Sequence, residues 1–333
     1  MDGREAGAPL GARIARASVG AGQTARGAPR GGGQGGMAAA TVVSTLPTYG
    51  DLAGKRALVT GGSGGIGAAI ARELGRQGAR VAVAYHTREE GARAVVRGLR
   101  EGAGGDAAAA FALGADLRSA AAAEALFDAA VERLGAVDIV INNAGIVLKG
   151  HSEDCGAAHF DDITAVNLRA PYLLTRKLAA HRTGRSEEDA RGMCVINNTS
   201  IHGTLSVEYM SLYAMTKAGL DSLTATLACE LAPLGIRVNA IAPGVVPVER
   251  TAAVFAKPET QGMWLPHLPA GRLGTVEDCA SLACFLALEQ ASGWMTGESV
   301  RVDGGMHARA NMPQRPKPPA PPAPAPVSDA LLE

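Results

Sequence analysis

The chain has 333 residues, of which 47% are hydrophobic, and its 32 Lys and Arg residues balance its 32 Asp and Glu residues. Such a chain can bury a core, and the balanced charge gives no electrostatic support to nucleic-acid binding. It contains no run of about 18 consecutive apolar residues, so no membrane-spanning helix is predicted. The five cysteines are widely spaced and lack a C-x-x-C pair. This pattern argues against a metal site or a disulfide framework and favours reduced cysteines packed in a core.

The two ends of the chain differ from its middle. Residues 1–49 are rich in Gly, Ala and Arg, which predicts a disordered segment or an organelle transit segment, with Met37 as an alternative start. Residues 308–333 are Pro-rich and predict an extended, disordered tail, with a docking site for a proline-reading domain as the second interpretation. We expect a cytoplasmic protein, unless the N-terminal segment directs import into an organelle.

Between these ends, residues 50–307 alternate short apolar runs with Ala- and Leu-rich stretches of helical length. Strands are predicted at 56–60, 80–85, 110–114, 138–142, 193–198, 236–241 and 298–302, and helices at 66–78, 119–135 and 212–233 among others. The alternation predicts one α/β domain with a doubly wound parallel sheet covered by helices on both faces. The polar stretch 182–191 is predicted to be a solvated surface loop.

A glycine-rich turn, TGGSGGIG, follows the first predicted strand. Because glycine makes up 43 of the 333 residues, the spacing of Gly61, Gly65 and Gly67 alone carries little information. A strand before the turn and an Ala-rich helix after it are the setting in which backbone N–H groups bind a pyrophosphate. The sequence therefore predicts a dinucleotide site at this turn.

The second predicted strand is followed by HTREE. An acidic residue there would bind the ribose 2′-hydroxyl of NAD, but His86 and Arg88 suit a 2′-phosphate instead. Thr87 and Glu90 have capping-box spacing, so a helix N-terminus that favours an anion is also expected. NADP(H) is therefore the preferred cofactor. NAD(H) stays open, because Arg88 can also be read as an ordinary exposed arginine and the glycine turn contains no basic residue.

Tyr213 and Lys217, in SLYAMTKAG, are four positions apart, so on a helix they share a face. Taken alone, an ordinary pair of helix neighbours explains them equally well. Ser200, however, stands at the end of a predicted strand, where doubly wound sheets bind ligands. The preceding strand ends in INNAG, and Asn167 lies in the helix expected after it.

The motifs TGGSGGIG, Asp116, NNAG, Asn167, Ser200, YAMTK, APG and VDGG occur in an order that resembles the short-chain dehydrogenase/reductase superfamily in its single-domain form. The resemblance spans about residues 52–306. It implies a Rossmann fold, an NAD(P) cofactor, and hydride transfer to or from the carbonyl or alcohol of a small substrate. It also implies a homodimer or homotetramer formed through helices around 160–180 and 212–233. The sequence is similar to sugar dehydrogenases and oxoacyl reductases, so a sugar, a polyol and a 3-oxoacyl compound all stay open.

The resemblance implies a catalytic role for each of four residues. Tyr213 would be the general acid/base. Lys217 and the cationic nicotinamide would lower the pKa of Tyr213, Ser200 would orient the substrate oxygen, and Asn167 would sustain a water relay to Lys217. The cofactor-binding residues it implies are Gly61, Ser63, Gly65, Ile66, Gly67, His86, Arg88, Asp116, Leu117, Asn143, Ala144, Gly145, Tyr213, Lys217, Pro243, Gly244 and Val246.

Two of these assignments have open alternatives. Asp116 would lie beside the adenine, or it could be a helix N-cap. The family often places a threonine shortly after the Pro-Gly, in contact with the nicotinamide amide. Here the first threonine is Thr251, so that contact is left open.

Residues 249–270 resemble the mobile substrate lid of the family. Substrate contacts are expected from His151, His202, Leu205, Glu208, Tyr209, Val246 and the stretch around Trp264. His202 could equally be a structural histidine. A non-redox enzyme on the same scaffold, such as an epimerase or dehydratase, and a nucleotide sensor without turnover are the alternative functions. The complete Asn-Ser-Tyr-Lys set argues against the sensor, and no metal is expected.

Overall fold

The computed structural model describes residues 52–309. The predicted segment 1–49 lies outside the described residues, and so does the predicted tail 308–333 apart from its first two residues. Within 52–309, seven strands form one parallel sheet in the order β3-β2-β1-β4-β5-β6-β7. The strands are β1 Arg56–Val59, β2 Arg80–Tyr85, β3 Ala110–Gly114, β4 Ile139–Asn142, β5 Cys194–Asn198, β6 Arg237–Pro243 and β7 Ser299–Val302. The predicted doubly wound α/β fold and all seven predicted strands are confirmed.

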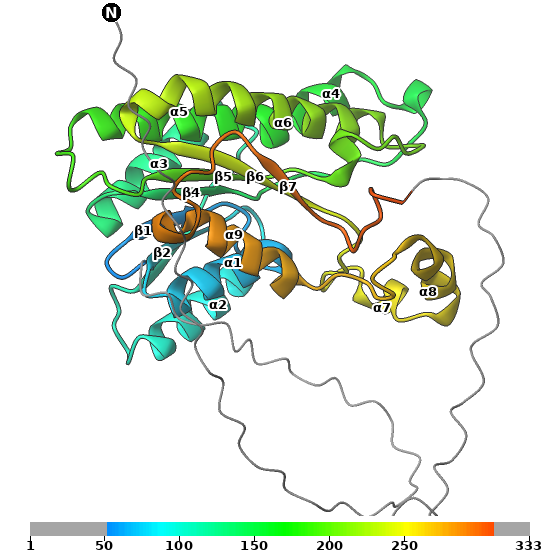
Figure 1. Cartoon of the computed structure of the whole chain (residues 1–333), viewed down its shortest axis with the longest axis horizontal. Helices are drawn as coiled ribbons and strands as arrows, with labels where there is room; N and C mark the ends of the chain where they lie inside the picture. Colours follow the sequence, from blue (N-terminus) through cyan, green and yellow to red (C-terminus); the bar gives the residue numbers. More distant parts are fainter. Residues whose placement is uncertain (1–51, 310–333) are drawn as a thin grey trace, which may run out of the picture. The chain divides into compact units, whose positions relative to one another are not determined.

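Helices cover both faces of the sheet (Figure 1). One layer contains α1 (Gly65–Arg76), α2 (Glu89–Gly102) and α9 (Val276–Ala287), and the other contains α3 (Ala120–Leu134), α5 (Ala170–Thr183) and α6 (Ser211–Leu231). The shorter helices are α4 Ala157–Thr164, α7 Ala252–Phe255, α8 Pro258–Trp264 and α10 Glu289–Ser292.

Each central strand contributes to two hydrophobic cores, because successive side chains of a strand point to opposite faces. Val59 and Ile141 pack with α1, α2 and α9, whereas Leu58 and Val140 pack with α3, α5 and α6. All four side chains are fully buried. Burial on both faces explains why these strands read as continuous apolar runs in the sequence.

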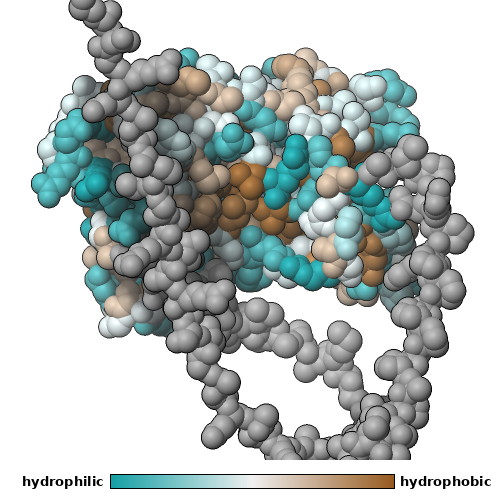
Figure 2. Space-filling model, viewed as in Figure 1, coloured by the Kyte–Doolittle hydropathy of each residue, from teal (hydrophilic) through white to brown (hydrophobic). Residues whose placement is uncertain are grey.

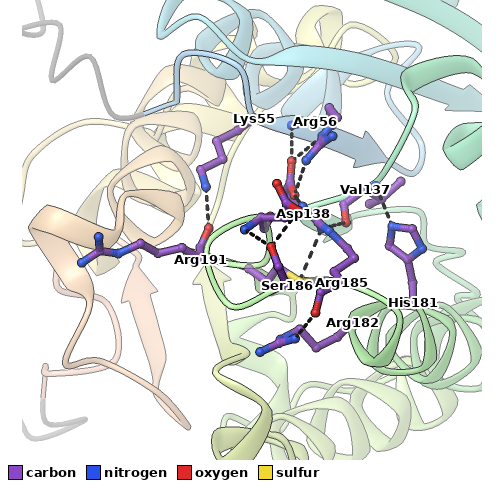
Figure 3. Close-up of polar contacts among 11 residues, drawn as sticks. Lys55, Arg56, Val137, Asp138, His181, Arg182, Arg185, Ser186 and Arg191 are labelled. Atoms are coloured by element: carbon purple, nitrogen blue, oxygen red, sulfur yellow. Dashed lines mark hydrogen bonds and ion pairs between the residues drawn. The ribbon is translucent and has the colours of Figure 1, made fainter.

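The amino end of the sheet is tied together by a buried carboxylate, Asp138, just before β4 (Figure 3). Its oxygens accept hydrogen bonds from the Arg56 side chain at 2.7 and 3.0 Å and pair with the Arg185 guanidinium at 2.7 Å. The Arg185 side chain is only 9% exposed. The prediction of a solvated loop over 182–191 is therefore wrong in part. Helix α5 continues to Thr183, and the Arg185 side chain of the loop is buried in its ion pair with Asp138.

The prediction that the cysteines pack in the core is confirmed for three of the five residues. Cys194, Cys279 and Cys284 are buried, Cys155 is half-buried and Cys229 is exposed, and all five are free thiols. Among residues 52–309, no helix is both long and apolar enough to cross a membrane.

Candidate active site

The strand order reverses between β1 and β4, and a crevice at the carboxyl ends of these strands is the expected ligand site of such a sheet. The glycine turn lies there. Gly61 (φ 62°) and Gly65 (φ 53°) adopt left-handed conformations that glycine tolerates best. A Cβ on Gly67 would lie 2.3 Å from Asn143 Nδ2 and 2.4 Å from Gly61 O, so only glycine lets α1 pack this closely. The turn and Ile66 line a groove of about 590 Å³ at the N-terminus of α1, a setting that fits a pyrophosphate.

A second hollow, of about 300 Å³, adjoins this groove. The predicted cofactor residues that line it are Gly61, Ser63, His86, Arg88, Asp116, Leu117, Ala144 and Gly145. Hydrogen bonds from Arg118 lower the pKa of the Asp116 carboxyl to about 2, so this side chain is ionised. Ser119 caps α3 by accepting a hydrogen bond from Ala122 N at 3.2 Å. The alternative of Asp116 as the helix N-cap is therefore wrong.

Arg88 stands at the junction of the two hollows and lines both. It is the N-cap residue of α2, which begins at Glu89 without a side-chain cap. The predicted Thr87–Glu90 capping box is not formed: the N-cap is Arg88 rather than Thr87, and the Glu90 carboxylate pairs with Arg97 at 2.8 Å. A Cβ on Gly64 would lie 2.5 Å from Arg88 Nη1. The folded chain thus brings a basic group onto the glycine turn, although the turn itself contains none.

A third cavity, of about 760 Å³, brings Ser200, Tyr213 and Lys217 together beyond the carboxyl ends of β5 and β6. Tyr213 and Lys217 share a face of α6, and Lys217 Nζ lies 5.6 Å from the centre of the Tyr213 ring. Lys217 Nζ donates a 2.6 Å hydrogen bond to the Asn198 carbonyl. Ser200 and Tyr213 both line this cavity. The cavity wall also contains the predicted cofactor residues Ile66, Asn143, Gly145, Pro243, Gly244 and Val246.

Burial controls the protonation of this pair. It raises the pKa of the Tyr213 phenol, and the hydrogen bond with Ser200 and the charge of Arg250 only partly offset it. Burial also lowers the pKa of Lys217 to about 8, against the opposing charge of Asp221. The folded chain by itself thus favours the neutral phenol, and the lowering of its pKa by Lys217 stays a prediction. The contribution of a cationic nicotinamide stays a prediction.

Asn167 lies behind the cavity rather than in its wall. It is fully buried in a π-helical segment, η2 (Ala165–Arg169), between α4 and α5. Its Oδ1 accepts from Ile146 N at 2.8 Å, and its Nδ2 donates to Ile146 O at 2.9 Å and to Thr216 Oγ1 at 3.1 Å. Asn167 thereby joins the segment after β4 to helix α6. Its part in a water relay stays a prediction.

The structure separates the predicted substrate contacts into two groups. His202, Glu208, Tyr209, Val246 and Trp264 line the 760 Å³ cavity. His151 and Leu205 are outside its wall: the His151 ring packs edge-on against Tyr209 at 4.6 Å, and Leu205 O lies 3.3 Å from His202 Nδ1. The predicted lid forms α7 and α8, which stand beyond the end of the sheet (Figure 1).

The sequence reasoning did not single out several residues of the site, among them Asn198, Glu249 and Arg250. Asn198 accepts from Lys217 and donates to Asn143 Oδ1 at 2.9 Å. Its place at the end of the predicted strand, two positions before Ser200, was the available signal. Glu249 and Arg250 belong to the predicted lid, but the resemblance assigned that lid to the substrate and not to the groove of the glycine turn, which both residues line.

Thr251, whose contact was left open, is engaged within its own loop. Its Oγ1 accepts from Val248 N at 3.0 Å and donates to Val248 O at 3.1 Å. The side chain also lies in the wall of the 760 Å³ cavity. Its hydroxyl therefore shapes the first turn of the lid.

A parallel sheet with a glycine turn at its switch point, and Ser, Tyr and Lys side by side in the adjoining cavity, defines a nicotinamide-dependent oxidoreductase. The family model described as enoyl-(acyl carrier protein) reductase matches residues 61–307. The chain belongs to the short-chain dehydrogenase/reductase family, as the sequence motifs indicated. It is an NAD(P)-dependent oxidoreductase of small molecules, and the predicted function class is confirmed.

Relatives of known name agree with this assignment. The chain is 42% identical over 258 residues to 3beta-hydroxysteroid dehydrogenase 1 of Eggerthella lenta, covering 78% of this chain and 95% of that protein. It is 36% identical over 255 residues to L-rhamnose 1-dehydrogenase (NAD(P)(+)) of Azotobacter vinelandii, covering 77% and 97%. A short-chain dehydrogenase from Burkholderia cenocepacia, solved in complex with NADP, matches with TM-score 0.69 and 33% identity, covering 77% of this chain and 99% of that one.

Proposed function

We propose that the protein is an NADP(H)-dependent alcohol dehydrogenase or carbonyl reductase in which Tyr213 is the general acid/base. The observation that carries this proposal is the convergence of Ser200, Tyr213 and Lys217 on a cavity that adjoins the glycine-turn groove. The nicotinamide cofactor, when bound, supplies or accepts the hydride. During alcohol oxidation, Tyr213 takes the hydroxyl proton of the substrate, and during carbonyl reduction it returns that proton. Ser200 holds the substrate oxygen beside the phenol.

Lys217 supports Tyr213 electrostatically in this proposal. Its ammonium lies 5.6 Å from the Tyr213 ring centre. Burial alone favours the neutral phenol, so in this proposal Lys217 stabilises the phenolate together with the cationic nicotinamide of the bound cofactor. The Asn198 carbonyl holds Lys217 Nζ in place, and Asn167 joins the surrounding backbone segments. With a pKa of about 8, Lys217 is charged near neutral pH. A cofactor-dependent change in NADPH absorbance during turnover distinguishes this redox role from an epimerase or dehydratase.

The preference for NADP(H) rests on Arg88 and His86, which line the hollow of about 300 Å³ beside the glycine-turn groove. The Arg88 guanidinium forms no ion pair or hydrogen bond with residues 52–309, so its charge is available to a 2′-phosphate. We expect Arg88→Ala to weaken NADPH about tenfold or more, as for a lost charged hydrogen bond, and NADH less than twofold. Calorimetric titration with both cofactors tests this. The control is Arg97→Ala on the same helix, whose side chain pairs with Glu90. Equal losses for NADPH and NADH would remove the basis for the preference.

For the substrate, the cavity supports a large alicyclic alcohol of the hydroxysteroid type. The cavity of about 760 Å³ is shared with the nicotinamide, and its apolar wall, formed by Val147, Val207, Phe255 and Trp264 among others, suits a rigid ring system. The 42% identical relative named a hydroxysteroid dehydrogenase points the same way. The second candidate is a sugar. It is favoured by His202 and Glu208 in the wall and by the relative named L-rhamnose 1-dehydrogenase.

A side-by-side oxidation assay with NADP⁺ separates these two candidates. We expect kcat/KM for a 3-hydroxysteroid to exceed that for rhamnose by at least about tenfold, since each buried ring carbon adds hydrophobic binding free energy. The reverse order would favour the sugar, and 3-hydroxyacyl thioesters serve as the third class in the same screen. Turnover of none of these three classes would overturn the substrate proposal while leaving the cofactor proposal intact.

We also propose that the protein forms a homo-oligomer. Tyr172 on α5 and Met215 on α6 are 45% and 39% exposed, and Trp294, just before β7, is fully exposed. Figure 2 shows apolar side chains gathered near the middle of the face where β7 ends the sheet, between the two helical layers. Exposed apolar patches of this kind mark interfaces between subunits. Light scattering coupled to size-exclusion chromatography measures the assembly.

A further inference from the structure

The carboxylate of Glu249 lies in the groove of the glycine turn, at the N-terminus of α1. Both oxygens of Glu249 accept hydrogen bonds from Gly65 N, at 3.0 and 2.9 Å. Gly65 is the first residue of α1, so this N–H is one of the unpaired donors at the helix N-terminus. Glu249 comes from the segment between β6 and α7, 184 residues along the chain.

The contact involves the lid segment and not only one long side chain. Val248 lies so close that its Cγ1 would be 3.0 Å from a Cβ on Gly65. Val248, Glu249 and Arg250 all line the groove that the glycine turn forms. The start of the lid therefore rests on the turn where a pyrophosphate is expected.

The surroundings keep Glu249 ionised. Burial by itself would raise the pKa of its carboxyl, but the hydrogen bond from Gly65 N and the charges of Arg88 and Arg72 outweigh burial and lower it. The site therefore already attracts an anion in the folded chain. Arg88, which we assign to the 2′-phosphate, and the helix N-terminus provide the same attraction to a dinucleotide.

We infer that Glu249 is an internal competitor for the cofactor's pyrophosphate, and that it leaves the N-terminus of α1 when the dinucleotide binds. The hydrogen bond of one N–H weakens when two anions share it. A Glu249 carboxylate beside the diphosphate would also repel the diphosphate, because both are negatively charged. Cofactor entry thus displaces Val248, Glu249 and Arg250 from the turn. The same segment leads into α7 and α8, so loading of the cofactor also repositions the lid over the substrate cavity.

This inference uses the dinucleotide binding that family membership establishes. It is independent of the proposed preference for NADP(H), because the pyrophosphate is common to NADPH and NADH. The two proposals therefore fail separately. A change in the ratio of NADPH affinity to NADH affinity tests the assignment of Arg88. An equal change in both affinities tests the role of Glu249.

The test compares Glu249→Gln and Glu249→Ala with wild type, by calorimetric titration with NADPH and with NADH. The matched control is Glu259→Gln, an exposed carboxylate on α8 of the same lid. We expect both Glu249 variants to bind NADPH and NADH about two- to tenfold more tightly, the range for a charge at a helix N-terminus. Glu259→Gln should bind both cofactors as wild type does. Unchanged or weaker binding of both cofactors in the two Glu249 variants would overturn the inference.

Discussion

Replacing the buried carboxylate at the amino end of the sheet should destabilise the protein without altering its chemistry. Asp138 is fully buried and accepts three hydrogen bonds from Arg56, at 2.7, 2.9 and 3.0 Å, besides its 2.7 Å ion pair with Arg185. Asp138→Asn removes the charge and leaves the Arg185 guanidinium, 9% exposed, without its counter-ion. Breaking a buried ion pair from one side costs about 3–5 kcal/mol.

Because Arg56 is partly exposed, we expect Asp138→Asn to lose free energy of unfolding at the low end of that range. Its side chain is 26% exposed, so water compensates part of its lost partner. We therefore expect the free energy of unfolding to fall by about 3 kcal/mol, which lowers the Tm of a domain of this size by roughly 6–12 °C. Activity at 25 °C should persist, because Asp138 precedes β4 whereas the candidate active site lies at the opposite ends of the strands.

Urea unfolding followed by circular dichroism measures this loss. The control is Asp128→Asn, which breaks the 2.6 Å pair with Lys177 at a carboxylate that is 63% exposed. Exposed ion pairs contribute at most about 1 kcal/mol. If Asp138→Asn loses no more stability than Asp128→Asn, the reasoning about the buried pair is refuted.

The same carboxylate makes stability depend on pH. Burial alone would raise the pKa of Asp138, but the hydrogen bonds from Arg56 and Arg185 outweigh it and lower the pKa below its ordinary value. A group with a lowered folded-state pKa stabilises the protein above its unfolded pKa, near ~3.9, and loses that contribution as the pH falls through the folded pKa. Wild type should therefore lose stability below about pH 4 more steeply than Asp138→Asn.

The remaining predictions concern the site itself. Tyr213→Phe should keep the fold and the NADPH affinity but lower kcat by about 10²-fold or more, and near-normal turnover would contradict its assignment as acid/base. Asp221→Asn removes the charge that raises the Lys217 pKa, so the alkaline limb of the pH–rate profile should move to lower pH. An unmoved limb would show that Lys217 does not control it. Trp264→Ala should raise KM for a hydroxysteroid more than for rhamnose, and equal increases would argue against Trp264 as the wall for a ring system.

The sequence by itself determined the architecture and the chemical class. The strands could be located because a strand buried on both faces must be a short apolar run, which is a local property. The tyrosine–lysine pair could be found because helical geometry places residues four apart on one face. Glycines after a strand and before a helix indicated the dinucleotide site for an equally local reason. Comparison with relatives then confirmed the family.

Only the tertiary structure decided which distant groups meet and what charge they carry. The sequence does not show that Arg185, in a polar stretch, is buried against Asp138, or that Glu249 reaches Gly65 across 184 residues. The pKa of Lys217, about 8, depends on how deeply α6 packs, which no spacing encodes. These features arise from contacts between elements far apart in the chain, and burial sets their strength by excluding water from the charges.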